Sequence, residues 1–190
     1  MNRALLWITV LAFALLGAVA AQASPTTYTI NRVIGEGSVT GFIQTDGTRG
    51  VLRASNVVDW SLVLSDGTAT FHLSGPLSGN NSQMFVRGAD FAAFENMLFF
   101  NFSGIDYGIL LFQQGLFSGD HYFCNATQPL ECLPGETVVP LSTRLGLQNV
   151  PLRGNVVIGI ADTAAPEPIT LVLLSGGVGI LVVSRKFLKA

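Results

Sequence analysis

The sequence predicts an all-β protein, with an antiparallel β-sandwich or jelly-roll-like domain between two apolar terminal segments. From Tyr28 onward, short runs of β-branched and aromatic residues are separated by Gly, Asn, Asp and Ser. This pattern is typical of strands joined by turns, and no amphipathic repeat is long enough for a substantial helix. The chain is 49% hydrophobic, but most of that excess lies at its two ends, so the middle has the composition of a globular domain.

Two Asp-Gly pairs predict β-hairpins, because this dipeptide between alternating runs favours a tight turn. Asp66-Gly67 separates the run 58–64 from a run that places Ala69, Phe71 and Leu73 on one face. Asp46-Gly47 is expected to join the run 38–45 in the same way to a run that starts near Arg49.

Further short strands and one helical turn complete the expected domain. Strands are predicted at 84–87, 97–102, 108–113, 116–123, 138–143 and 155–160. Eight or more strands in about 140 residues are typical of a double sheet. A helical turn is expected at 89–96, where Phe91, Phe94 and Glu95 would cover one sheet.

The charge of the body, residues 24–165, disfavours nucleic acid as a partner. It has six arginines, no lysine and eleven acidic residues, a net charge of −5. Such a surface repels a phosphate backbone. The remaining basic residues all lie in the terminal segments, at Arg3, Arg185, Lys186 and Lys189.

Cys124 and Cys132 are predicted to form a disulfide, because an exported chain meets an oxidising compartment. Two free thiols are the alternative. A metal site is not expected, since neither histidine lies at a ligand-like spacing from the cysteines. No cofactor is predicted.

Residues 1–23 have the composition of a cleavable signal peptide. Arg3 precedes an uncharged, largely apolar stretch from Ala4 to Ala21. Ala21-Gln22-Ala23 then fits the small-x-small pattern that signal peptidase reads. We expect cleavage after Ala23 and export of the body; an uncleaved anchor is the alternative.

Residues 166–190 have the composition of a short membrane anchor. Ten of the fifteen residues at 169–183 are Ile, Leu or Val. A helix of fifteen residues spans only about 22 Å, whereas the hydrocarbon core of a membrane is about 30 Å thick. Snorkelling of the basic residues that follow extends this length. By the positive-inside rule, the same residues keep that end cytoplasmic. We predict a single transmembrane helix at about 169–183, with the body on the other side of the membrane.

The order of Pro166-Glu167-Pro168, apolar stretch and basic end resembles the tail of the PEP-CTERM proteins of Gram-negative bacteria. The match runs from Pro166 to Lys189. In that family the tail is read by an exosortase, a membrane-embedded cysteine protease or transpeptidase. The resemblance implies a sorting motif at Pro166, Glu167 and Pro168, an anchor at 169–183 and retention charges at Arg185, Lys186 and Lys189. A plain anchor that no enzyme processes is the alternative.

The opening of the body is also similar to a pattern found in PEP-CTERM ectodomains. It comprises residues 37–50 and 56–60. This likeness implies the same family and no particular activity.

No side chain of the body is predicted to be catalytic. His72 falls on the solvent face of its strand. Ser118, Asp120 and His121 are close in sequence, which favours a turn over a triad, because strand neighbours point to opposite faces. The aspartates lack the Asp-x-Asp spacing of a calcium loop, so no such loop is predicted. A calcium site assembled from distant aspartates stays an alternative; the aspartates are Asp46, Asp59, Asp66, Asp90, Asp106 and Asp120. The threonines are scattered, and no flat, regular threonine face is predicted.

These features predict an exported structural or adhesive protein of the cell envelope or exopolysaccharide matrix, and not an enzyme. It is expected at the inner membrane before processing and at the cell surface or outside the cell afterwards. Its partners would be signal peptidase, an exosortase, the membrane and, as a candidate ligand, exopolysaccharide. Two alternatives stay open: a polysaccharide- or ligand-binding module, marked by an exposed aromatic row with nearby carboxylates, and a secreted hydrolase, marked by a cleft that joins His121 to an acid and a nucleophile.

Overall fold

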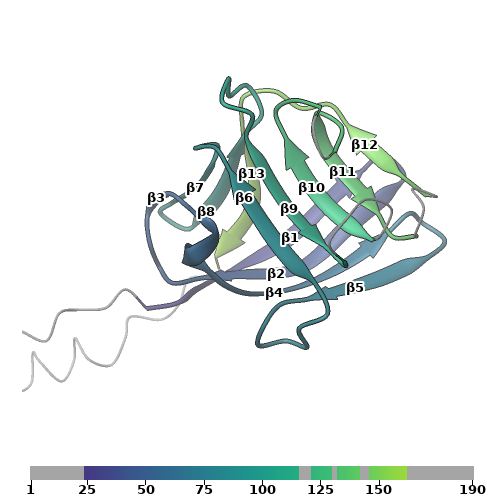
Figure 1. The fold of residues 1–190 in the computed structure, drawn as a ribbon, viewed down its shortest axis with the longest axis horizontal. Helices are drawn as coiled ribbons and strands as arrows, with labels where there is room; N and C mark the ends of the chain where they lie inside the picture. The colour runs from purple at the N-terminus through teal and green to yellow at the C-terminus, as the bar shows by residue number, and fades with distance from the viewer. Residues whose placement is uncertain (1–23, 116–120, 130–131, 142–145, 162–190) are drawn as a thin grey trace, which may run out of the picture.

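The computed structural model describes residues 24–115, 121–129, 132–141 and 146–161. Within these ranges, two antiparallel sheets pack face to face (Figure 1). This confirms the all-β, sandwich-like class. The predicted signal peptide (1–23) and the predicted sorting tail (166–190) lie outside the described residues. No helix in the described ranges has the length and hydropathy needed to cross a membrane.

The larger sheet has eight strands and the smaller sheet has five. The larger sheet runs in the order β3 (Gly50–Val51), β7 (Phe91–Phe94), β8 (Met97–Asn101), β13 (Asn155–Ala161), β1 (Thr26–Ile34), β2 (Gly37–Thr45), β4 (Val57–Ser65) and β5 (Thr70–Ser74). The smaller sheet runs in the order β12 (Gln148–Val150), β11 (Gly135–Val139), β10 (Tyr122–Ala126), β9 (Ile109–Gln113) and β6 (Gln83–Arg87). A short 3-10 turn, η1 (Ala54–Asn56), precedes β4.

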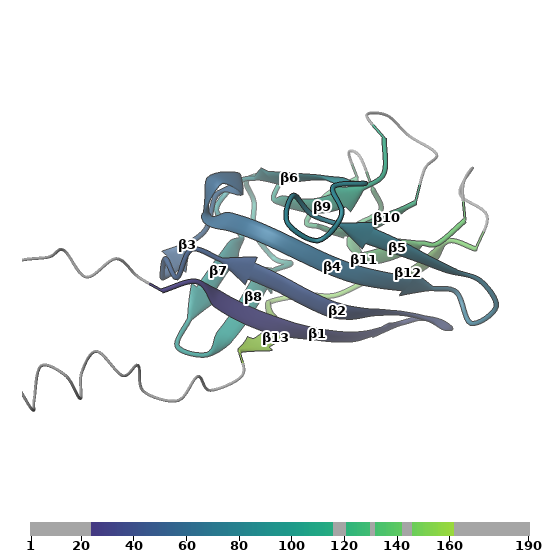
Figure 2. The ribbon, with the colours of Figure 1, turned by 90° about the horizontal axis from the view of Figure 1, so that it is seen from below.

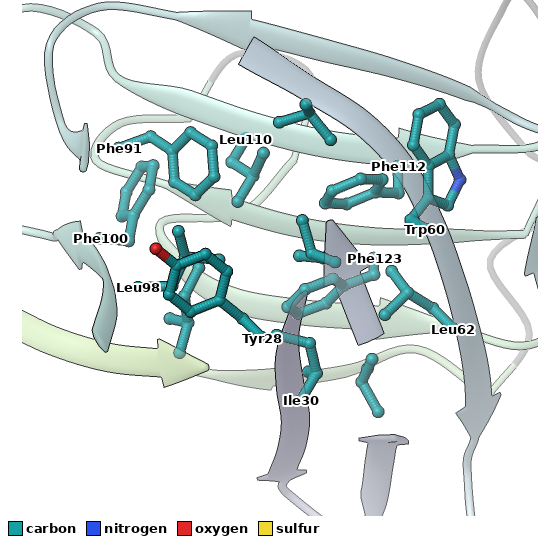
Figure 3. Close-up of a cluster of buried hydrophobic side chains, with 14 of the residues drawn as sticks. Tyr28, Ile30, Trp60, Leu62, Phe91, Leu98, Phe100, Leu110, Phe112 and Phe123 are labelled. Atoms are coloured by element: carbon teal, nitrogen blue, oxygen red, sulfur yellow. The ribbon is translucent and has the colours of Figure 1, made fainter. Parts of the chain in front are cut away.

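The core lies between the sheets and follows from alternation along each strand. On β1, Tyr28, Ile30 and Ile34 are buried, whereas the residues between them, apart from Arg32, are exposed. Large side chains of the two sheets meet in the middle; Figure 3 shows Trp60 of β4 beside Phe112 of β9, with ring centroids 5.4 Å apart. The indole N–H of Trp60 donates to Ser82 Oγ at 2.8 Å, so its polar atom is satisfied inside the core.

The first and last described strands are neighbours. Tyr28 near the start of β1 pairs with Ala161 at the end of β13. The described chain therefore enters and leaves the domain at the same end of the larger sheet (Figure 2).

One predicted hairpin is confirmed and the other is wrong. The β4–β5 hairpin forms at Asp66-Gly67, where Asp66 Oδ1 accepts the backbone N–H of Thr68 and of Ala69. Asp46-Gly47 does not make a hairpin, because β2 pairs with β4 and the short β3 pairs with β7 instead. Asp46 closes a longer loop, with Oδ1 accepting from Thr48 N–H and Oδ2 from Asn56 Nδ2.

The predicted helical turn at 89–96 is wrong, since Phe91–Phe94 is strand β7. Phe91 and Ala93 point into the core opposite Phe100 and Leu98 of β8, while Phe94 is 61% exposed. Glu95, with a φ of 52°, lies in the turn between β7 and β8. A pattern of two buried and two outward positions fits a strand as well as a single helical turn, and pairing with β8 decides between them.

Other strand boundaries differ from the predicted ones. The runs expected at 116–123 and 138–143 appear as β10 at Tyr122–Ala126 and β11 at Gly135–Val139, and residues 116–120 and 142–143 lie outside the described ranges. The short strand β12 and the long strand β1 were not predicted as separate elements.

Candidate functional site

Most of the outer face of the smaller sheet, on β9, β10 and β11, is buried. Cys124 on β10 and Cys132 before β11 form the predicted disulfide, with Cα atoms 6.5 Å apart. Together they belong to a second buried apolar cluster, separate from the main core, with Leu147 packed against it; the cluster is Ile109, Leu111, Tyr122, Cys124, Ala126, Cys132 and Val139. These three strands therefore offer little surface to a ligand, whereas the outward residues of β6 (Gln83, Phe85 and Arg87) are exposed.

The histidines are placed apart and differently. His121 stacks on Phe71, with ring centroids 3.5 Å apart, and its Nδ1–H donates to the Pro140 carbonyl oxygen. Its sequence neighbours Ser118 and Asp120 lie outside the described residues. His72 is exposed as predicted, and its Nε2 lies 2.8 Å from Ser61 Oγ in a hydrogen bond. No carboxylate within the described ranges is hydrogen-bonded to the His72 ring.

The outer face of the larger sheet, here called the open face, consists of the side chains that point away from the core. Strands β13, β1, β2, β4 and β5 present it side by side in Figure 2. Among the described residues, no charged side chain is exposed on these strands' outward positions. Asp59 points outward on β4 but is only 4% exposed, because Leu77 N–H and the Ser78 hydroxyl donate to its carboxylate.

The open face has two chemically distinct halves. The half on β7, β8 and β13 is apolar, and cross-strand pairing places its members side by side: Ala92, Phe94, Met97, Phe99, Val157 and Ile160. The half on β1, β2, β4 and β5 has mainly hydroxyl and amide groups, such as Thr29, Asn31, Ser38, Thr40, Ser61, Ser65 and Thr70. Residues that are scattered in the sequence thus share one surface.

A hollow lies where the two halves meet. Within the described residues, β1 pairs with β13 only at Tyr28↔Ala161 and Thr29↔Ile160, and β13 has an irregularity between Val157 and Gly159. The strands diverge beyond these pairs and leave a hollow of about 410 Å³. Its lining combines Thr29, Asn31 and Arg32 with Val157, Ile158, Gly159 and Ile160.

Arg32 lines this hollow and links the two sheets through hydrogen bonds. Its Nε and Nη2 donate to the Glu136 carboxylate of β11 at 2.8 to 3.1 Å, and its Nη1 donates to the Val157 carbonyl oxygen at 3.1 Å. The Glu136 side chain is 1% exposed and that of Arg32 is 23% exposed. A guanidinium has five N–H groups, so donors remain that can face a ligand in the hollow. The paired charges cancel, which suits a neutral, hydroxyl-rich ligand.

Comparisons with known proteins found no match: no protein-family model, no curated protein and no solved structure matches the chain.

Two site classes raised by the sequence have specific outcomes in the structure. The exposed aromatic residues Phe85, Phe94 and Tyr107 come from β6, β7 and the β8–β9 loop, so no aromatic row forms in the described part of the chain. No group of three or more His, Cys, Asp or Glu side chains in those residues is arranged to hold a metal ion.

Sequence reasoning missed Arg32, Glu136 and the open face. One signal was available for Arg32, since it occupies an inward position between Ile30 and Ile34 on an alternating strand. A charged residue at such a position requires a partner. Nothing local indicated that the partner would be Glu136, which lies 104 residues further along the chain.

Proposed function

We propose that this chain is an exported structural or adhesive protein of the cell envelope or exopolysaccharide matrix, sorted by an exosortase through its C-terminal tail. The observation that carries the adhesive part is the open face, a broad sheet surface without exposed charge. Contiguous exposed apolar surface on a folded domain is typical of interaction sites. The protein would be held at the inner membrane before processing and would act at the cell surface or outside the cell.

Two further features support export and sorting. The disulfide between Cys124 and Cys132 suits an oxidising compartment. The pairing of β1 with β13 brings both ends of the domain together, so a signal peptide and a membrane anchor would attach at the same end. A domain held in this way would project its opposite end from the membrane and leave the open face accessible.

Determination of the mature C-terminus tests the sorting proposal. We expect mass spectrometry of the cellular pool to show a C-terminus upstream of Ala190, and a Glu167→Gln variant to accumulate as the unprocessed chain in the membrane fraction. The matched control is Glu36→Gln, an exposed acid in the turn between β1 and β2. An intact Ala190 on the whole wild-type pool would contradict the proposal.

Matrix retention tests the adhesive role. A Phe94→Ser/Ile160→Ser variant removes two side chains of the apolar half that are 61% and 54% exposed. We expect it to be processed normally but released from the matrix by a mild wash that leaves the wild type bound. Phe85→Ser is the control, because Phe85 is 47% exposed but lies on β6 of the smaller sheet. Equal retention of all three proteins would contradict the role of this face.

The hollow favours a second candidate function, recognition of a saccharide unit. Its volume of about 410 Å³ and its hydroxyl, amide and guanidinium groups are suitable for a small polyol. Asn31→Ala should then weaken binding of the full-length chain to a panel of neutral matrix glycans, while Asn80→Ala, in the loop after β5, should not. Absence of binding to any glycan of the panel would favour the purely structural role.

A further inference from the structure

Asp90 is a buried carboxylate with one oxygen, Oδ2, that accepts no hydrogen bond from the described residues. It lies just before β7 and is 7% exposed. A buried carboxylate stays ionised only if it is paired, hydrogen-bonded or bound to a metal, and otherwise takes up a proton. A structure that keeps such a group in place therefore points to a missing partner.

The loop between β8 and β9 wraps around this carboxylate. A β-carbon added to Gly104 or to Gly108 would overlap the Asp90 carboxylate, so both glycines are needed to let it in. The loop is fixed at its base, where Asn101 N–H donates to the Asp90 carbonyl oxygen and Gly154 N–H donates to Ser103 Oγ, each at 2.8 Å. The carboxylate thus sits in a cradle shaped by backbone atoms.

A second carboxylate, that of Asp106, belongs to the same loop. Asp106 is exposed and lies between the two glycines that contact Asp90. Burial, and then the nearby charge of Asp106, raises the pKa of Asp90. Two acids with no basic partner between them repel each other, and a shared cation removes that repulsion.

Other unpartnered polar atoms lie on β10 and directly after it. Thr127 N–H donates to the Gly108 carbonyl oxygen at 3.0 Å, which places Thr127 beside the cradle. Thr127 Oγ1 is buried without a partner in the described part of the chain. The same holds for both amide atoms of Asn125, a fully buried residue of β10 on the same side as Phe123. The end of the sandwich near Gly108 is therefore rich in unused oxygen atoms.

We propose that the Asp90 and Asp106 carboxylates bind a divalent cation, best matched by Ca²⁺, beside the cradle in which Gly104 and Gly108 hold the Asp90 carboxylate. Calcium takes oxygen ligands in irregular geometry, whereas Mg²⁺ demands a near-ideal octahedron. With two carboxylates the expected Kd is about 10⁻⁴ to 10⁻³ M, as in extracellular calcium modules. The site does not depend on the proposed function, because it lies on the β8–β9 loop and not on the open face.

Thermal unfolding of the purified full-length chain, with CaCl₂ as the probe, tests this site. We expect Tm to rise saturably with CaCl₂ up to about 10 mM, and MgCl₂ to have a much smaller effect. Asp106→Asn should weaken the calcium response at least about tenfold without loss of the fold, because Asp106 is exposed. Glu95→Gln, which neutralises an exposed turn acid on β7–β8, should respond as the wild type does.

Asp90→Asn separates a cation ligand from a merely structural residue. It should abolish the calcium response and leave the Tm in EDTA equal to or above that of the wild type, because a buried charge is replaced by a neutral isostere. A wild-type Tm that does not respond to calcium would overturn the proposal. So would an equal calcium response in the wild type, Asp90→Asn and Asp106→Asn.

Discussion

The two outer faces of the sandwich differ in what covers them, and the difference separates stability from interaction. On β9, β10 and β11 the smaller sheet buries its outer face, here called the closed face, under Cys132 and Leu147, around the Cys124–Cys132 disulfide. The larger sheet leaves its outer face open, with Phe94 61% and Ile160 54% exposed. Changes on the closed face should therefore act on folding, whereas changes on the open face should act on contacts with other molecules.

The largest loss in the free energy of unfolding is expected at the Arg32–Glu136 pair, which links the two sheets. Arg32→Met leaves the Glu136 carboxylate, 1% exposed, without its partner. The free energy of unfolding should fall by about 3–5 kcal/mol, measured by urea denaturation. An Arg32→Met/Glu136→Leu double variant should recover most of this loss, because both charges are then removed. If the free energy of unfolding of the single variant fell by less than about 1 kcal/mol, the pair would not act as a buried salt bridge.

The second-largest loss in the free energy of unfolding is expected on the closed face. Cys124→Ala/Cys132→Ala removes the bridge across a sequence separation of 8 residues. The chain-entropy model gives a loss of about 2–3 kcal/mol in the free energy of unfolding. Denaturation of the wild type with and without reducing agent checks the same quantity, and reduction should have no effect on the variant. If reduction destabilised both proteins equally, the bridge would not be the cause.

A pH effect is expected at Asp90, whose pKa is raised by burial and by Asp106. The folded state binds this proton more tightly than the unfolded state, so Asp90 stabilises at low pH and that contribution is lost as pH rises through the raised pKa. Asp46 and Asp66 act in the opposite sense, because hydrogen bonds from Asn56 and from the Ala69 backbone respectively lower their pKa values. In EDTA, the stability of the wild type relative to Asp90→Asn should therefore increase as pH falls. Parallel pH profiles for the two proteins would contradict this assignment.

The smallest effect on stability is expected on the open face. Ile160→Ser changes a side chain that is 54% exposed, so the free energy of unfolding should change by about 0.5 kcal/mol or less. Val138→Ser is the comparison on an inward position of β11, where burial is complete and a loss of more than about 2 kcal/mol is expected. Similar losses at both positions would show that the open face is packed against something.

The sequence predicted local features well where two neighbouring runs supported the same turn. Asp66-Gly67 is followed by the five residues of β5, which pair with β4. Asp46-Gly47 carries the same dipeptide, but only Gly50–Val51 forms a strand after it, and β3 pairs with β7. The turn chemistry is alike at both places. Strand order, which no local pattern reports, made one a hairpin and the other a loop.

The candidate sites were less predictable than the strands. The bridge between Cys124 and Cys132 was predicted because an exported chain meets an oxidising compartment. Asp90 and Asp106 appeared in the sequence only as members of a widely spaced set of aspartates. Gly104 and Gly108 give no hint of a partner until the β8–β9 loop is placed against Asp90, so the cradle needed the tertiary structure.

By itself, the sequence determined the all-β class, most strand positions and the disulfide, and its terminal motifs predict export and sorting. These features depend on period-2 alternation, turn residues and short spacings, which are local. Only the tertiary structure decided that one outer face is closed and the other open, that Arg32 meets Glu136 and that Asp90 lies in a glycine cradle. These contacts join residues far apart in the chain, and which strands become neighbours is set by the packing of the whole sandwich rather than by any single segment.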